Sequence, residues 1–321
     1  MPTPKDFANN VEIKWCPGCG DHAILKHLQS ALAKSGSEPH MTAIISGIGC
    51  ASRLPYYMNT YGFHTIHGRA FPIATGLKLS RPELDVWVIT GDGDALSIGG
   101  NHYLHLFRRD IDLSILLFNN HVYGLTKGQY SPTSSIGQIS KTSPSGSIEH
   151  PINALKLALT SGARFIARTF DRDAAFIQQM MMDAKKHKGS AIIEILQNCP
   201  IFNDGVFDFF IEKANQPQRT LRLEHGKPLT FGSDAEYAIV LNGFRPTIVA
   251  KELAGSDIWI HDQTNQILAE LLCRFGDEGF EDMPLALGVI YQNPRQISVD
   301  SHYEDYSEKV ESIIQSGKFA G

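Results

Sequence analysis

The sequence contains no hydrophobic run long enough to cross a membrane. Its longest apolar runs, such as residues 113–118, have the length of a strand, whereas a membrane-spanning helix needs about 20 apolar residues. The N-terminus also lacks the apolar core of a signal peptide. We therefore expect a cytoplasmic protein without a membrane segment.

Basic residues are neither numerous nor clustered. The 321 residues include 29 Lys and Arg against 34 Asp and Glu, a formal net charge of -5, without a basic stripe for a phosphate backbone. Nucleic-acid binding is therefore not expected. Hydrophobic residues make up 42% of the chain and charged residues 20%, which are the proportions of a globular protein. This length suits one large α/β domain, or one domain with a smaller appendage.

Cysteine is scarce and odd in number, with five residues. In a cytosolic chain this disfavours a disulfide framework and favours metal ligation or redox chemistry. The Cys-Pro-Gly-Cys sequence at 16–19 fits a zinc knuckle, a thioredoxin-like pair or half of an iron-sulfur site. Cys50 and Cys199 are single cysteines in loops, and Cys199 precedes a proline, as in many cluster sites. Cys273 lies in an apolar helical pattern and is expected to be a buried core thiol.

Strand-like and helix-like segments alternate along the first 200 residues. Apolar positions 24, 25, 28 and 32 have helical spacing, and Gly36 follows as a stop. Short apolar runs at 41–46, 85–90, 113–119, 164–168 and 191–196 are separated by helix-length segments such as 71–80 and 174–187. This alternation predicts an α/β fold, with a mostly parallel sheet covered by helices on both faces and ligands at the carboxyl ends of strands.

The distinctive loops follow the predicted strands, so we expect them on one rim. They are Gly-Ile-Gly-Cys at 47–50, Gly-Asp-Gly-Asp at 91–94, Asn-His-Val-Tyr-Gly at 120–124 and Asn-Cys-Pro at 198–200. Residues 131–147 are rich in Ser, Thr, Pro and Gly, which suits a long surface loop that covers a site or a partner, or is merely flexible. After residue 200 the alternation weakens, and we expect a hairpin at 237–249 and helices at 265–274 and 303–316.

Asp92 and Asn120 lie 28 positions apart, at the ends of consecutive predicted strands. Glycines on both sides of Asp92 allow close approach to a phosphate, and a carboxylate with an amide oxygen suits Mg²⁺. Gly-Asp-Gly alone is also common in turns and calcium loops. With Asn-Asn about thirty residues later, the pattern resembles the thiamine diphosphate motif. By that likeness Asp92, Asn120 and the Val122 carbonyl ligate the metal.

The Gly-Asp-Gly to Asn-Asn pattern and the cysteine pattern together resemble the β subunits of 2-oxoacid:ferredoxin oxidoreductases over about the first 200 residues. The matching stretches are Trp-Cys-Pro-Gly-Cys-Gly-Asp at 15–21, Ser-Gly-Ile-Gly-Cys at 46–50, His-Gly-Arg at 67–69, Thr-Gly-Asp-Gly-Asp at 90–94 with Gly-Gly-Asn-His at 99–102, and Tyr-Gly-Leu-Thr-Lys-Gly-Gln at 123–129. The last two look most like the 2-oxoglutarate branch of the family.

The resemblance implies a set of site residues. Residues 10–200 would bind thiamine diphosphate and an iron-sulfur cluster, and residues 201–321 would be an irregular C-terminal extension that packs on a partner subunit. The implied [4Fe-4S] ligands are Cys16, Cys19, Cys50 and Cys199. The implied cofactor contacts are Ile48, Gly49, Cys50, Ala51, His67, Gly91, Gly93, Asp94, Gly124 and Leu125. The implied catalytic candidates are His67, Leu125 and Arg53, with Arg53 meeting the substrate carboxylate.

The resemblance also implies a reaction and partners. An α subunit, in an (αβ) or (αβ)₂ complex, would supply the glutamate that activates thiamine diphosphate, so this chain would be inactive alone. The complex would oxidatively decarboxylate a 2-oxoacid with coenzyme A and pass the electrons to ferredoxin. Two rivals remain open from the residues: a cluster-free thiamine diphosphate decarboxylase subunit, and a zinc-knuckle nucleotide-binding protein.

Overall fold

The computed structural model describes residues 1–294, 308–309, 311–312 and 315–316. The strands of its larger sheet are β1 (Thr42–Ser46), β2 (Tyr61–His64), β3 (Asp85–Gly91), β4 (Ser114–Asn119), β5 (Phe165–Phe170), β6 (Ala191–Leu196), β7 (Thr220–Arg222) and β11 (Leu285–Gln292). Their order in space is β2-β1-β3-β4-β6-β5-β11-β7. All pairs from β2 to β5 are parallel, and β11 is antiparallel to β5. The predicted, mostly parallel sheet is thus confirmed.

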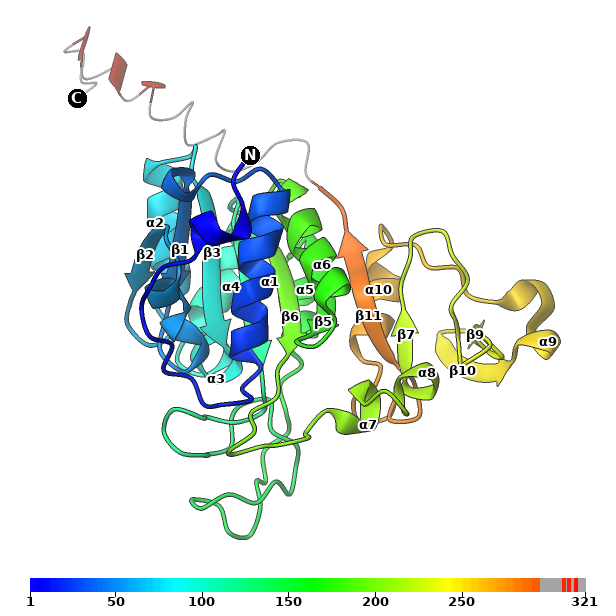
Figure 1. The fold of residues 1–321 in the computed structure, drawn as a ribbon. Coiled ribbons are helices and arrows are strands. Elements are labelled where there is room, and N and C mark those ends of the chain that lie inside the picture. The colour runs from blue at the N-terminus through cyan, green and yellow to red at the C-terminus, as the bar shows by residue number, and fades with distance from the viewer. Residues whose placement is uncertain (295–307, 310, 313–314, 317–321) are drawn as a thin grey trace, which may run out of the picture.

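Two layers of helices cover the sheet. One layer, in front of the sheet in Figure 1, holds α1 (Asp21–Lys34) and α6 (Ala174–Lys186); the other holds α2 (Ala70–Ser80), α4 (Gly100–Arg109), α5 (Ala154–Thr160) and α10 (Gln266–Cys273). Successive strand residues face opposite layers, so Ile44 packs toward α1 and Ile45 toward α2. Each fully buried aliphatic side chain of this kind stabilises the fold by about 1.5–3 kcal/mol.

The first long helix forms as its sequence predicts. The apolar positions 24, 25, 28 and 32 of α1 are all buried. Gly36 follows with a φ of +72°, a left-handed conformation that glycine adopts without strain. The helix therefore ends where the glycine permits the chain to turn toward β1.

The remaining described elements are short. They are η1 (Pro4–Phe7), η2 (Pro39–Met41), η3 (Ala51–Tyr57), α3 (Asp92–Leu96), α7 (Asp208–Ile211), α8 (Gln216–Arg219), β8 (Thr230–Phe231), β9 (Tyr237–Asn242), β10 (Arg245–Ala250), α9 (Lys251–Ala254) and η4 (Gly255–Asp257). The predicted hairpin is confirmed as β9 and β10, which pair antiparallel. The predicted helix at 303–316 lies largely outside the described residues. No helix in the described part of the chain combines the length and apolarity needed to span a membrane.

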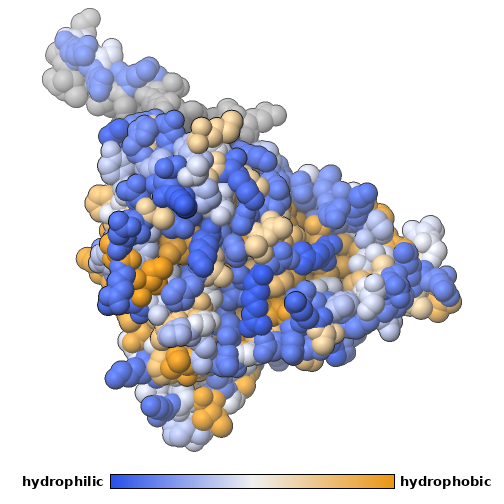
Figure 2. Space-filling model, viewed as in Figure 1, coloured by the Kyte–Doolittle hydropathy of each residue, from blue (hydrophilic) through white to orange (hydrophobic). Residues whose placement is uncertain are grey.

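The C-terminal residues are less irregular than expected. Strands β7 and β11 return to the main sheet, so a boundary at residue 200 does not separate the sheet from the C-terminal residues. Edge strand β2 escaped prediction because it has no buried face: Tyr61 and Phe63 are more than half exposed. Figure 2 shows apolar residues on the left flank of a mostly hydrophilic view, where Figure 1 places β2 and α2.

Candidate cofactor site

The distinctive loops share one rim of the sheet, as predicted. Strands β1, β3, β4 and β6 are consecutive parallel neighbours, so their carboxyl ends lie side by side. The loops that begin at residues 47, 92, 120 and 197 therefore meet at this edge, below the sheet in Figure 1. Binding sites of parallel α/β sheets occupy such edges.

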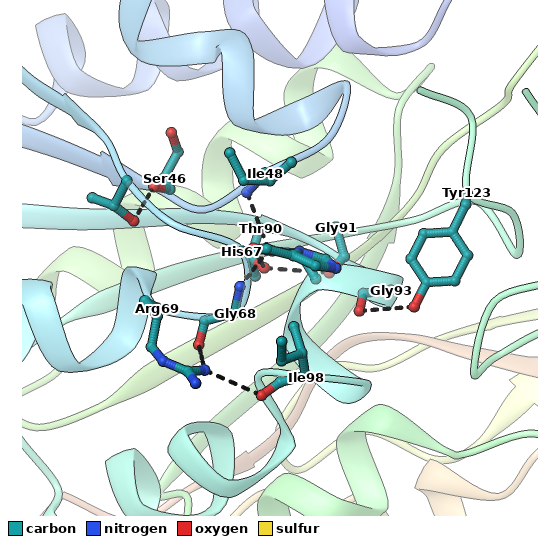
Figure 3. A network of polar contacts seen from close by, with 12 residues as sticks. Ser46, Ile48, His67, Gly68, Arg69, Thr90, Gly91, Gly93, Ile98 and Tyr123 are labelled. Carbon is teal, nitrogen blue, oxygen red and sulfur yellow. Dashed lines mark hydrogen bonds and ion pairs between the residues drawn. The ribbon is translucent and has the colours of Figure 1, made fainter. Parts of the chain in front are cut away.

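The carboxylate of Asp94 joins three separate segments of the chain at this rim. Its Oδ1 accepts hydrogen bonds from the Ile48 amide at 3.1 Å and the Gly68 amide at 2.8 Å, and its Oδ2 accepts one from the Thr90 hydroxyl at 2.8 Å. Figure 3 shows Ile48, Gly68 and Thr90 converging from separate segments. The β-carbon of a larger residue at Gly47 would lie 2.0 Å from Oδ2. Asp94 is thus a buried anchor that sets the shape of the rim.

The His67 ring is held by the same carboxylate. Its Nδ1 lies 2.6 Å from Asp94 Oδ1, and 38% of its side chain is exposed. Because a carboxylate oxygen accepts, Nδ1 carries the proton and Nε2 of the neutral ring is left as an acceptor. Asp94 therefore selects the tautomer and orientation of His67, whose position beside Thr90 and Gly91 is seen in Figure 3.

Asp92 is buried next to the Ser- and Thr-rich segment. Its Oδ2 accepts hydrogen bonds from the Ser131 hydroxyl at 2.5 Å and the Thr133 hydroxyl at 2.6 Å. Burial raises the pKa of Asp92 to about 6, although both hydroxyl bonds favour the charged form. A carboxylate desolvated in this way gains from a bound cation, which fits its predicted place as a Mg²⁺ ligand.

The two asparagines that end β4 have different partners. The Asn119 amide donates to Glu194 at 2.8 Å, and its Oδ1 lies 2.9 Å from the Thr133 hydroxyl oxygen as a second, more distant acceptor than Asp92 for the one Thr133 proton. Asn120 donates to Gln197 at 2.7 Å, and its Oδ1 accepts from the Val122 amide at 3.2 Å. Thr133 thus links Asp92 to Asn119, whereas Asn120 shapes the turn that carries Val122.

Tyr123 and Gly124 connect the Gly-Asp-Gly loop to the cysteines. The Tyr123 hydroxyl donates to the Gly93 carbonyl at 3.2 Å, as Figure 3 shows, and a β-carbon at Gly93 would lie 2.1 Å from the tyrosine ring. A β-carbon at Gly124 would lie 3.5 Å from Cys50 Sγ and 3.6 Å from Cys199 Sγ. Gly93 thus admits the Tyr123 ring, and Gly124 lies against two sulfurs.

Four cysteines gather at this rim. Cys16, Cys19 and Cys199 all lie near enough to Cys50 for charge on one to affect another. Burial first, and the nearby Asp21 carboxylate second, raise the pKa of Cys50 to about 12 and the pKa of Cys19 still further. Thiolates gathered this closely need a cationic centre to neutralise their charge, so the donor set fits an iron-sulfur cluster.

Cys273 lies apart from that group, as predicted. It is fully buried in α10, within the apolar layer that includes α2 and α5. Over the described residues, no three or more His, Cys, Asp or Glu side chains are arranged around a position for a single metal ion.

The other predicted contacts lie on or beside the rim. Ile48, Gly49 and Ala51 flank Cys50 after β1, and Gly91 ends β3. The Arg53 Nε donates to the Tyr57 hydroxyl at 3.0 Å, whereas Leu125 is 51% exposed beside Gly124. The roles of these residues toward a cofactor or substrate stay predictions.

Known proteins share both the sequence and the fold. Residues 47–195 match the family described as "Thiamine pyrophosphate enzyme, C-terminal TPP binding domain". The chain is 48% identical over 286 residues to 2-oxoglutarate oxidoreductase subunit KorB of Mycobacterium tuberculosis, an alignment that covers 88% of this chain and 76% of the relative. It is 46% identical to the β subunit of 2-oxoacid:ferredoxin oxidoreductase 1 of Aeropyrum pernix, with 62% of each chain covered.

The chain belongs to the β subunits of the 2-oxoacid:ferredoxin oxidoreductases. A solved 2-oxoglutarate:ferredoxin oxidoreductase from Magnetococcus marinus has the same fold, with a TM-score of 0.78 and 31% identity over 99% of this chain and 97% of that one. This confirms the predicted family and fold and makes the β subunit part of an oxidoreductase. The Gly-Asp-Gly loop lies inside its thiamine diphosphate-binding domain.

Sequence reasoning missed several residues of this site in the β subunit. Ser131 and Thr133 contact Asp92, Tyr123 contacts Gly93, and the Gln197 amide donates to Cys19 Sγ at 3.3 Å. The unusual composition of residues 131–147 marked that segment, but the pattern gave no reason to pair its hydroxyls with Asp92.

Proposed function

We propose that the β subunit, with an α subunit, catalyses coenzyme A-dependent oxidative decarboxylation of 2-oxoglutarate to succinyl-CoA. In this reaction the 2-oxoacid loses CO₂, its acyl group joins the coenzyme A sulfur, and two electrons and one proton are released. A [4Fe-4S] cluster held by the rim cysteines would carry these electrons toward ferredoxin. The solved protein from Magnetococcus marinus, described with 2-oxoglutarate, coenzyme A and succinyl-CoA bound, supports this choice of substrates.

One observation carries the proposal: two consecutive residues connect the Gly-Asp-Gly loop, expected to bind the diphosphate, with the four rim cysteines. Tyr123 packs on Gly93, and Gly124 lies against Cys50 and Cys199. Asp92, Asn120 and the Val122 carbonyl would hold Mg²⁺ with the diphosphate, while Cys16, Cys19, Cys50 and Cys199 would hold the cluster.

Thiamine diphosphate and the cluster would have different roles in the reaction. Thiamine diphosphate would supply the electron sink for decarboxylation, and the cluster would supply one-electron redox chemistry. The chain's own residues orient and enclose these groups: Asp94 fixes the rim and the His67 tautomer, and Tyr123 braces the diphosphate loop. His67 and Leu125 would then face the reacting centre.

Both the names of the relatives and the exposed apolar surface of this chain support a partner subunit. The name β subunit, borne by several relatives, implies an α subunit, and we propose an (αβ) or (αβ)₂ complex in the cytoplasm. Exposed apolar side chains of β2, Tyr61 and Phe63, support a protein neighbour beside the rim. The C-terminal extension would add contacts to the same partner.

Cofactor analysis tests the proposal directly. The complex purified without oxygen should contain iron and sulfide in a ratio of about one, together with thiamine diphosphate and Mg²⁺. Zinc in place of iron, or thiamine diphosphate without iron, would support one of the two rival interpretations instead.

Substrate choice needs a separate assay. Steady-state kinetics with 2-oxoglutarate and with pyruvate should give the higher kcat/KM for 2-oxoglutarate. A second carboxylate needs a cationic contact, and Arg53 is one candidate near Cys50. An unchanged preference in Arg53→Ala would remove that role from Arg53 without affecting the reaction assignment.

A further inference from the structure

The segment 131–147 contributes buried hydroxyls to the centre of the site. Ser131, Thr133 and Ser134 are each no more than 3% exposed, although they begin a segment with the composition of a surface loop. The Ser131 amide donates to Ser134 Oγ at 2.8 Å, and the Ser134 hydroxyl donates to the His121 carbonyl at 2.6 Å. The turn is therefore fastened to the loop that follows β4.

Both hydroxyl bonds to Asp92 reach the same carboxylate oxygen. Ser131 and Thr133 approach Oδ2 at 2.5 and 2.6 Å, and the two hydroxyl oxygens lie 3.2 Å apart. Two donors on one oxygen restrict rotation of the carboxyl group, and carboxylate ligands of metal ions are commonly oriented by such hydrogen bonds. Hydrogen bonds to a charged acceptor are also stronger than those between neutral groups.

A second acceptor, farther away than Asp92, lies on the other side of the Thr133 hydroxyl. It lies 2.9 Å from Asn119 Oδ1, and the Asn119 amide donates to Glu194 Oε1 at 2.8 Å, which fixes which way the amide points. Glu194 in turn accepts from Arg168 Nε at 2.7 Å. Both charged side chains are buried and help line a cavity of about 1000 Å³. The chain of contacts thus runs from Asp92 across β4, β6 and β5.

We propose that Ser131 and Thr133 are positioning residues for the cation site, holding the Asp92 carboxylate in one orientation for Mg²⁺. This inference rests on the proposed function, because it assumes that Asp92 binds Mg²⁺ with the thiamine diphosphate. A purely structural role would stabilise the fold without changing the affinity for the cation. The two roles therefore differ in a binding measurement.

The test uses the αβ complex stripped of metal and thiamine diphosphate. Calorimetric titration with thiamine diphosphate over a range of Mg²⁺ concentrations gives the Mg²⁺-dependent affinity. Thr133→Val, which keeps the shape but removes the hydroxyl, and Ser131→Ala should each weaken it about 10- to 100-fold, the usual effect of losing a residue that orients a metal ligand. Thr133→Ser, which keeps the hydroxyl, should bind almost as wild type.

Ser147→Ala is a matched control. The Ser147 hydroxyl is equally buried in the same segment, but it donates to the Ser135 carbonyl at 2.5 Å. Its loss should leave the affinity unchanged. Wild-type affinity in Thr133→Val and Ser131→Ala, or equal weakening by Thr133→Ser and Thr133→Val, overturns the inference. If Thr133→Val does not assemble, Ser131→Ala carries the test.

Asp92→Ala separates this inference from the proposed function. If Asp92→Ala abolishes binding while Ser131→Ala and Thr133→Val bind normally, the cation site stands and the positioning role is wrong. If Asp92→Ala binds as wild type, the cation site itself is wrong, and the positioning role is overturned with it.

Discussion

Removing the Asp94 carboxylate should loosen the whole rim. In Asp94→Ala, the Ile48 and Gly68 amides lose their acceptor, and each buried donor left unpaired costs about 1–3 kcal/mol. The Thr90 hydroxyl can turn to the Gly91 carbonyl at 3.3 Å, and His67 is partly exposed to water. The two amides therefore set the expected loss of unfolding free energy at about 2–6 kcal/mol.

Asp94→Asn should cost only about 1–2 kcal/mol, because its oxygen still accepts from both amides and its NH₂ donates to Thr90. Thermal unfolding would rank the variants, and hydrogen exchange would show faster exchange at the Ile48 and Gly68 amides in Asp94→Ala. Glu83→Ala, at an exposed pair with Arg81, is the control and should change stability by less than about 0.5 kcal/mol. Equal losses in Asn and Ala variants, or unchanged exchange in Asp94→Ala, would refute the anchoring role.

The other predictions concern the cluster, the buried ion pair and pH. Serine at any of the four rim cysteines should lower iron content and the brown chromophore, whereas Cys273→Ser should leave both intact; a stable cluster without Cys199 would contradict that ligand set. Arg168→Met leaves the buried Glu194 carboxylate without its charged partner and should lower the free energy of unfolding by about 3–5 kcal/mol, measured by thermal unfolding. Arg222→Met, which breaks a more exposed pair with Asp173, should lower it by less than about 1 kcal/mol. Burial lowers the pKa of His187 to about 4, so the unfolded chain binds the proton first, and stability should fall as pH drops from about 6.5 toward 4. His187→Leu should make that decline shallower in acid unfolding curves, and an unchanged slope would count against the buried neutral histidine.

The sequence was informative wherever chemistry depends on neighbours along the chain. Strand ends, the Gly-Asp-Gly loop and the single cysteines after strands all predict one rim, because parallel neighbours present their carboxyl ends together. The buried position of Cys273 also follows from local spacing, since helical periodicity sets which face is apolar. Edge strand β2 and the return of β11 to the sheet were not predictable in this way. Strand β2 is exposed on both faces, so its sequence shows no alternation of apolar and polar residues. The antiparallel pairing of β11 with β5 depends on how distant segments pack.

What the sequence by itself determined is the family, the fold class and the kinds of ligand at the rim, since these depend on residue types at fixed spacings. What the tertiary structure decided is which groups touch. Asp94 lies two residues from Asp92, yet it anchors the loops while Asp92 meets Ser131 and Thr133 from a segment about forty residues later. Spacing cannot distinguish two carboxylates in one turn, because their partners come from distant loops that only the folded sheet brings together.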